Sequence, residues 1–172
     1  MTENKKNKDI LIIVLLVIYV AFLTWIILFK MQFDFKFLPY IRSINLIPFG
    51  DSTIVNGKID LTEIINNMIV FIPVGAYLGI LEKNKKFMTK VLPIFGLSLV
   101  YEILQYIFHI GATDITDLIM NTLGGAIGIC VINVFYRIFK NEEKVDKVLK
   151  VLATICTILL ISLASILIIA NI

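Results

Sequence analysis

Two runs of apolar residues without a single charge constrain this chain more than any other feature of its sequence. They cover Ile10–Phe29 and residues 151–170, and each is 20 residues long. An α-helix rises about 1.5 Å per residue, so about 20 residues cross the roughly 30 Å of hydrocarbon in a bilayer. A chain of 172 residues with two such runs is expected to be an integral membrane protein.

The composition agrees with this interpretation and excludes several classes of protein. Hydrophobic residues make up 59% of the chain and charged residues 17%, which rules out a water-soluble enzyme. The net charge of +3 comes from lysines and arginines clustered at the ends of apolar runs, so no nucleic-acid partner is expected. Cys130 and Cys156 lie inside apolar segments and are expected to behave as small hydrophobic side chains. No cofactor is expected.

Three weaker apolar segments, which also carry polar residues, lie between the two charge-free runs. They cover about residues 64–81, 91–110 and 115–136. The sequence therefore predicts an all-α, polytopic membrane protein in which one domain, residues 1–172, forms a bundle of about five transmembrane helices. The connection over residues 30–60 is so rich in apolar side chains that part of it is expected to lie in the membrane interface.

The first run has an alternative interpretation as a cleaved signal peptide. It is preceded by lysines, as a signal peptide would be. Its apolar stretch is longer than a usual signal sequence, however, and no cleavage site of the small-x-small type follows it. A retained first transmembrane helix is therefore favoured.

The distribution of positive charge predicts how the helices are oriented. Twelve of the 16 lysines and arginines lie before the first span, between the second and third, or between the fourth and fifth. Positively charged connections stay in the cytoplasm, so the N-terminus is expected inside and the C-terminus outside. The connection over residues 30–60 is then expected outside as well.

Polar side chains inside the predicted spans need a physical reason, because an ionisable group at a helix centre costs about 2.5 to 3.5 kcal/mol. Their spacing of three, four or seven residues places most of them on one face of each helix, and we expect these faces to look inward. With the predicted orientation, all of them lie in the outer half of the membrane. They are Asn66 and Asn67 in the second span, Glu102 and Gln105 in the third, and Asp114, Asp117 and Asn121 in the fourth.

A cation on the same side of the membrane is expected to compensate the acids. Arg42 and Asn45 lie in the outer connection, and Arg42 is the nearest candidate to pair with buried carboxylates. A purely structural alternative remains open, in which the polar groups form hydrogen bonds that only hold the helices together. His109, at the outer end of the third span, is expected to be an interfacial residue.

Four motifs follow one another over about residues 42–128. They read Arg-Ser-Ile-Asn-Leu-Ile-Pro-Phe at 42–49, Asn67 followed by Phe-Ile-Pro-Val-Gly at 71–75, Glu102-x-x-Gln105, and Asp114-Ile-Thr-Asp117 followed by Asn121 and Gly124. In order and spacing they resemble the VanZ-like family of bacterial membrane proteins.

The resemblance implies a multi-pass protein of the bacterial cytoplasmic membrane that is associated with low-level resistance to the glycopeptide antibiotic teicoplanin. It implies no established catalytic residue. The positions that match the motifs and carry polar side chains form a candidate binding site, which we call the polar cluster. Its members are Arg42, Asn45, Asn67, Glu102, Gln105, Asp114, Asp117 and Asn121.

Three functions remain open from the sequence. In the first, which is favoured, a non-enzymatic cell-envelope protein in contact with membrane lipids binds the polar part of an amphiphile, such as a lipid-linked cell-wall precursor or a lipoglycopeptide antibiotic. In the second, Glu102, Asp114 and Asp117 hold a divalent metal in an enzyme that acts on a lipid-linked phosphate. In the third, the protein is a structural or chaperone-like membrane partner without a ligand.

Reporter fusions test the predicted topology. Fusions after Lys8 and Lys86 should report a cytoplasmic location, and fusions after Lys58, His109 and Ile172 an external one, because of the charge asymmetry. A cytoplasmic signal at His109 or at the C-terminus would contradict the orientation and the outer placement of the polar cluster.

Overall fold

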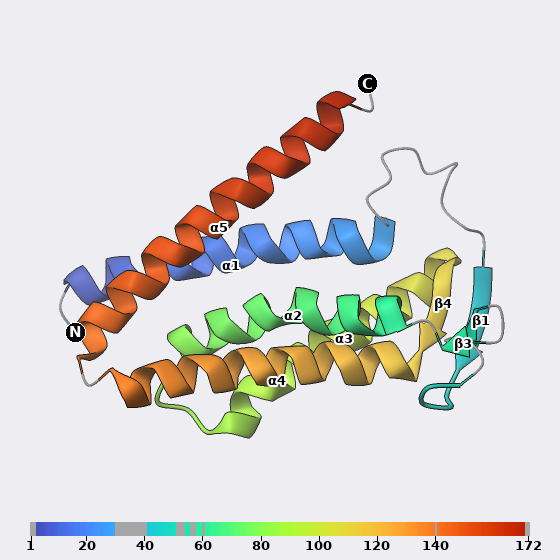
Figure 1. Cartoon of the computed structure of the whole chain (residues 1–172), viewed down its shortest axis with the longest axis horizontal. Helices are drawn as coiled ribbons and strands as arrows, with labels where there is room; N and C mark the ends of the chain where they lie inside the picture. Colours follow the sequence, from blue (N-terminus) through green and yellow to red (C-terminus); the bar gives the residue numbers. More distant parts are fainter. Residues whose placement is uncertain are drawn as a thin grey trace.

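Five long helices dominate the computed structural model, which describes residues 3–29, 41–50, 54–55, 58–59, 61–139 and 141–170. All five are long and apolar enough to cross a membrane, which confirms the predicted fold class. The helices are α1 (Glu3–Phe29), α2 (Leu61–Leu81), α3 (Phe87–Phe108), α4 (Ile115–Ile138) and α5 (Glu142–Ala170) (Figure 1).

The helices extend beyond the predicted spans, mainly at their starts. The third helix begins at Phe87 rather than at residue 91, so Lys90 is helical and buried. The fifth begins at Glu142 rather than at residue 151, and its first turns are charged. The predicted spans followed apolar residues alone, whereas the helices also include charged residues at their starts. In α3 the buried Lys90 reaches the backbone carbonyl of Lys83 at 3.5 Å.

Short strands at one end of the bundle were not predicted. In the first sheet, β1 (Ile41–Asn45) pairs in parallel with β4 (Ile110–Asp114). In the second, β2 (Ile54–Val55) pairs with β3 (Lys58–Ile59) in antiparallel fashion. The prediction that Asp114 lies in a transmembrane helix is wrong, because Asp114 ends β4 and caps α4. The parallel pairing satisfies backbone groups that an irregular connection would leave open at the end of the bundle.

Helices α2 and α4 are in backbone contact, and glycine makes this contact sterically possible. A Cβ atom added at Gly124 would lie 1.9 Å from the carbonyl oxygen of Met68. One added at Gly75 would lie 1.8 Å from the carbonyl oxygen of Gly125, and one added at Gly128 would lie 2.0 Å from the carbonyl oxygen of Ile72 in α2. Small residues spaced four apart therefore let these two helices approach more closely than any larger side chain allows.

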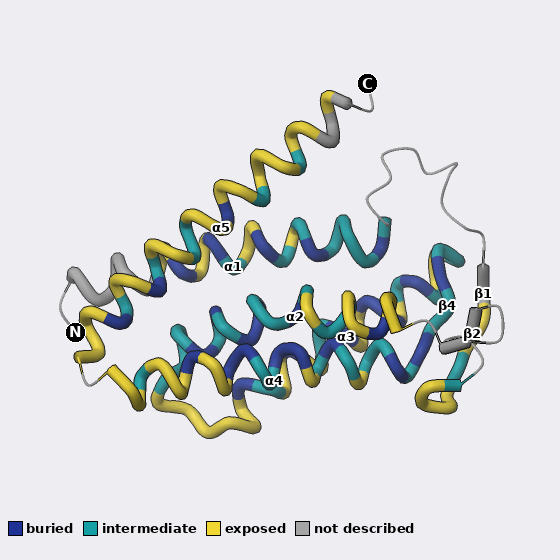
Figure 2. Tube along the Cα trace, in the orientation of Figure 1, coloured by how far each residue is buried: buried dark blue, intermediate teal, exposed yellow. Residues whose placement is uncertain are grey.

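The burial pattern is that of a bundle surrounded by lipid. Phe71, Ile94 and Ile129 are fully buried and join α2, α3 and α4 in one core cluster. Exposed residues follow most of α5, which leans away from the other helices (Figure 2). Many of these exposed side chains are large and apolar, as a lipid-facing surface requires.

The strands lie at one end of the molecule, and the N-terminus and the α4–α5 connection lie at the other (Figure 1). At this second end Lys83, which lies in the connection after α2, forms ion pairs with acids at the start of α5. Its Nζ lies 2.7 Å from an oxygen of Glu142 and 3.6 Å from one of Asp146. Burial alone would lower the pKa of Lys83, but hydrogen bonds and charge attraction to these two acids raise it above its usual value. Lys83 therefore keeps its positive charge at physiological pH.

Gly124→Val should separate α2 from α4, because the new side chain would overlap the carbonyl oxygen of Met68. We expect a loss of at least about 1 to 3 kcal/mol in the free energy of unfolding. Thermal unfolding of the purified protein in detergent measures it. Gly96→Val is the matched control, since a Cβ atom at helical Gly96 meets nothing within 4 Å. Equal stability of the two variants would contradict the backbone contact.

Candidate functional site

A buried carboxylate in α3 holds the connection between α3 and α4. Glu102 is only 3% exposed, and its Oε2 accepts a hydrogen bond from the backbone N–H of Asp114 at 2.8 Å. The Thr113 hydroxyl donates to the backbone carbonyl of Glu102 at 3.0 Å. The chain turns from α3 into β4 at His109, whose φ of 59° lies in the left-handed region. Glu102 therefore fixes β4 against α3 with both its side chain and its backbone.

Asp114 is the point where β1, from the connection between α1 and α2, joins this arrangement. Its Oδ1 accepts a hydrogen bond from the backbone N–H of Thr116 at 2.8 Å, which caps the N-terminus of α4. Its Oδ2 accepts one from the Asn45 side-chain amide at 3.1 Å. Asn45 and Asp114 are also partners in the parallel register of β1 and β4. Two residues far apart in the sequence are thus brought together by both backbone and side chains.

A second link closes the 42–49 motif over the start of α4. The backbone N–H of Phe49 donates to Oγ1 of Thr116 at 2.9 Å, and the Thr116 side chain is fully buried. Inside the motif, the backbone N–H of Ile47 donates to Oδ1 of Asn45 at 3.1 Å. Phe49 itself has a φ of 56°, so the motif makes a tight turn there. The described part of the 42–49 motif is therefore held against the start of α4.

Two buried amides deeper in the bundle are only half satisfied. The Nε2 of Gln105 donates to the carbonyl of Ile27 at 3.3 Å, and the Nδ2 of Asn121 donates to Oγ of Ser98 at 2.9 Å. Gln105 Oε1 and Asn121 Oδ1 are buried without a hydrogen-bond donor among the described residues. Leaving a buried acceptor unpaired costs about 1 to 3 kcal/mol. These two oxygens therefore give α3 and α4 an unused capacity to accept hydrogen bonds.

The remaining predicted residues are placed less centrally. Asp117 is half-buried in the first turn of α4 and acts electrostatically on Glu102. Asn67 is half-buried, but Asn66 is exposed, so the expectation that Asn66 faces inward is wrong. Successive helical residues point about 100° apart, which lets only one of this pair face the bundle.

The predicted pairing of Arg42 with the acids stays a prediction. The backbone of Arg42 lies in β1 opposite Gly111. Its side chain lies outside the described part of the structure.

Comparison with known proteins identifies the motifs. The sequence model of the VanZ/LLP1 family matches residues 16–140, which include every member of the polar cluster. This chain belongs to the VanZ/LLP1 family. It is 40% identical over 134 residues to Protein VanZ of Enterococcus faecium, an alignment that covers 77% of this chain and 79% of that protein. No solved structure matches the chain. The family resemblance of the four motifs is confirmed.

Several residues that build this VanZ-family site were not predicted from the sequence. Ser98 accepts a hydrogen bond from Asn121. The Thr113 hydroxyl holds β4 to the backbone of Glu102 in α3, and the Thr116 hydroxyl holds Phe49 to the start of α4. Ser98 lies four residues before Glu102 and seven before Gln105, so its helical spacing was a usable signal. The two threonines gave no such signal, because their role depends on the strand pairing.

The acids do not assemble as a metal site in the described residues. No three Asp, Glu, His or Cys side chains come together there with the geometry that a metal ion needs. Glu102, Asp114 and Asp117, the ligand set of the metal-enzyme alternative, are not such a group. Glu102 and Asp114 instead use carboxylate oxygens to accept hydrogen bonds from backbone and amide N–H groups.

Thr116→Val should release the 42–49 motif from α4, because valine keeps the shape of threonine but cannot accept the hydrogen bond from Phe49. A lost hydrogen bond costs about 0.5 to 1.5 kcal/mol. Hydrogen exchange at the Phe49 amide should therefore become up to about tenfold faster. Thr122→Val is the control on the same helix, since the Thr122 hydroxyl donates only to the carbonyl of Leu118, at 2.7 Å. Unchanged exchange in the Thr116 variant would contradict the link.

Proposed function

We propose that this protein lowers the susceptibility of the bacterial envelope to teicoplanin by binding an amphiphile at the polar cluster. The amphiphile is a lipid-linked cell-wall precursor or the lipoglycopeptide antibiotic itself. The polar part of the ligand contacts the cluster, and its acyl chain lies among apolar side chains at the same end of the bundle. The protein acts by binding and performs no chemical step on its ligand.

The observation that carries this proposal is the pair of unpaired, buried acceptors, Gln105 Oε1 and Asn121 Oδ1. They lie in helices that also carry the carboxylates of Glu102 and Asp117. A site so rich in acceptors favours a ligand that brings donors, and the sugar hydroxyls, amides and ammonium groups of both ligand classes are donors. A bundle held together only for structural reasons gains nothing from leaving these two oxygens without a partner.

Apolar side chains beside the cluster support the second half of the proposal. Leu46, Ile47 and Phe49 are all exposed, although they are large and hydrophobic. They belong to the motif that hydrogen bonds hold against the start of α4. An acyl chain that lies within one leaflet of the membrane can pack against these exposed apolar side chains while its polar part reaches the cluster.

Cells that produce the protein should tolerate teicoplanin better than matched cells, while tolerance to vancomycin, which lacks the acyl chain, should change less. Glu102→Gln and Asp117→Asn remove charge but keep size and hydrogen-bonding capacity. A hydrogen bond to a charged group contributes about 1.5 to 3 kcal/mol, so each variant should bind the ligand roughly 10- to 100-fold more weakly. Minimal inhibitory concentrations and binding of labelled teicoplanin to the purified protein in nanodiscs measure the two effects.

The control for these variants is Glu82→Gln, which removes a carboxylate at the opposite end of the bundle, where Glu82 pairs with Lys85. It should retain both tolerance and binding. Membrane levels of every variant are measured by immunoblot, because a structural role would reduce protein level and tolerance together. If Glu102→Gln and Asp117→Asn protected cells as well as the wild type does, the cluster would have no part in the function.

A further inference from the structure

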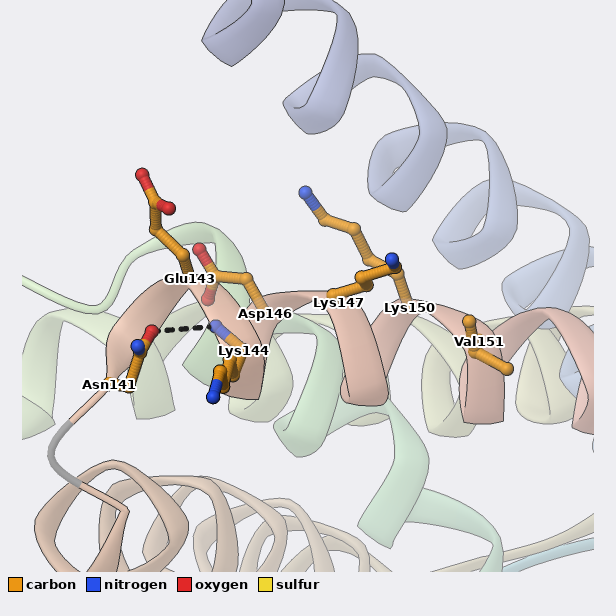
Figure 3. Close-up of a pocket in the computed structure, with 7 residues that line it drawn as sticks. All are labelled: Asn141, Glu143, Lys144, Asp146, Lys147, Lys150 and Val151. Carbon is orange, nitrogen blue, oxygen red and sulfur yellow. Dashed lines mark hydrogen bonds between the residues drawn. The ribbon is translucent and has the colours of Figure 1, made fainter.

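A charged cavity and an apolar cavity adjoin each other at the end of the bundle opposite the strands. The charged cavity has a volume of about 540 Å³ and is formed by the first turns of α5 together with Asn141. Its described lining residues are Asn141, Glu143, Lys144, Asp146, Lys147, Lys150 and Val151 (Figure 3). Neither this cavity nor its residues belong to the polar cluster.

Three lysines, Lys144, Lys147 and Lys150, line the charged cavity. Lys147 and Lys150 are three residues apart on α5, and their side chains extend to the same side of the helix (Figure 3). Two acids, Glu143 and Asp146, line the same cavity. Asp146 accepts a hydrogen bond from the Tyr136 hydroxyl at 2.5 Å and lies 3.6 Å from Lys83, so its charge is already compensated. The lining thus carries three lysines beside Glu143 and the compensated Asp146, and Lys147 and Lys150 place two ammonium groups next to each other.

The second cavity, of about 370 Å³, shares Asn141 and Lys144 with the first. The rest of its described lining is apolar and comes from the end of α4 and the start of α5. These residues are Phe135, Phe139, Val145, Val148 and Leu149. A basic cavity that continues into an apolar one matches a ligand with an anionic head and a hydrocarbon tail.

The depth of the two cavities points to a membrane lipid. Val151, which lines the charged cavity, is the first residue of the charge-free run that crosses the bilayer. The lysines just before it therefore lie at the level of lipid head groups, where basic residues attract anionic phospholipids.

We propose that these adjoining cavities bind an anionic phospholipid. Lys147 and Lys150 contact its phosphate, and an acyl chain lies along Phe135, Val148 and Leu149. Free phosphate would use the same lysines but would leave the apolar cavity empty. The bound lipid would lie where the end of α4 meets the start of α5, beside the cluster in which Ile132 packs against Val145 and Leu149.

Lipid binding to the purified full chain tests this proposal. Native mass spectrometry of the protein in detergent, titrated with dioleoyl phosphatidylglycerol or dioleoyl phosphatidylcholine, compares the affinities for an anionic and a zwitterionic lipid. One double variant, Lys147→Gln with Lys150→Gln, removes the two cavity lysines. The matched control, Lys85→Gln with Lys86→Gln, removes the same charge from exposed positions at the same end of the molecule that do not line either cavity.

The wild type should bind phosphatidylglycerol in preference to phosphatidylcholine. Each lysine is expected to contribute about fivefold, so the cavity variant should bind phosphatidylglycerol roughly 25-fold more weakly, while the control stays near the wild type. Equal affinity of the cavity variant and the wild type, or an equal loss in the control, would overturn the site. Displacement of the lipid by inorganic phosphate at comparable concentration would overturn the assignment to a lipid. Thermal unfolding of each variant without lipid separates lost binding from lost folding.

Discussion

The absence of water inside a bilayer governs this structure, because every polar group there needs a partner from the chain itself or from a ligand. The buried hydrogen bond from the Asp114 backbone to Glu102 meets this need where α3 is followed by β4. One carboxylate oxygen of Asp114 accepts a hydrogen bond at the N-terminus of α4, and the other accepts one from the Asn45 side chain. The carboxylates of Glu102 and Asp114 thereby join α3, β1 and the start of α4, and the 42–49 motif can close on the bundle.

The close contact of α2 and α4 is the apolar counterpart of this polar framework. Gly75, Gly124 and Gly128 bring the two helix backbones together. Asn121 is three residues before Gly124 and seven before Gly128, so it lies on the same face of α4, next to this contact. There its amide donates a hydrogen bond to Ser98 of α3. The close packing of α4 on α2 thus adjoins the polar contact that joins α4 to α3.

Much of this arrangement follows from sequence, and the failures have a common cause. Hydropathy predicts the five helices because the need to span hydrocarbon is encoded locally in each segment. Helical spacing predicts that Glu102 and Gln105 share a buried face. The parallel pairing of β1 with β4 joins residues far apart in the chain. Neither strand is long enough, or alternates strongly enough between apolar and polar residues, to be predicted from the sequence. The prediction that Asp114 is helical failed for this reason, and the roles of Thr113 and Thr116 went unnoticed with it.

The two ends of the molecule are chemically opposite, and this difference limits what each can bind. At the strand end, the unpaired amide oxygens of Gln105 and Asn121 can only accept hydrogen bonds, so they favour ligands rich in donors. At the other end, lysines beside an apolar hollow favour an anionic head group. The two ends therefore favour ligands of different chemistry. An amphiphile held by Glu102 and Asp117 would present hydroxyl, amide or ammonium groups to these two side chains.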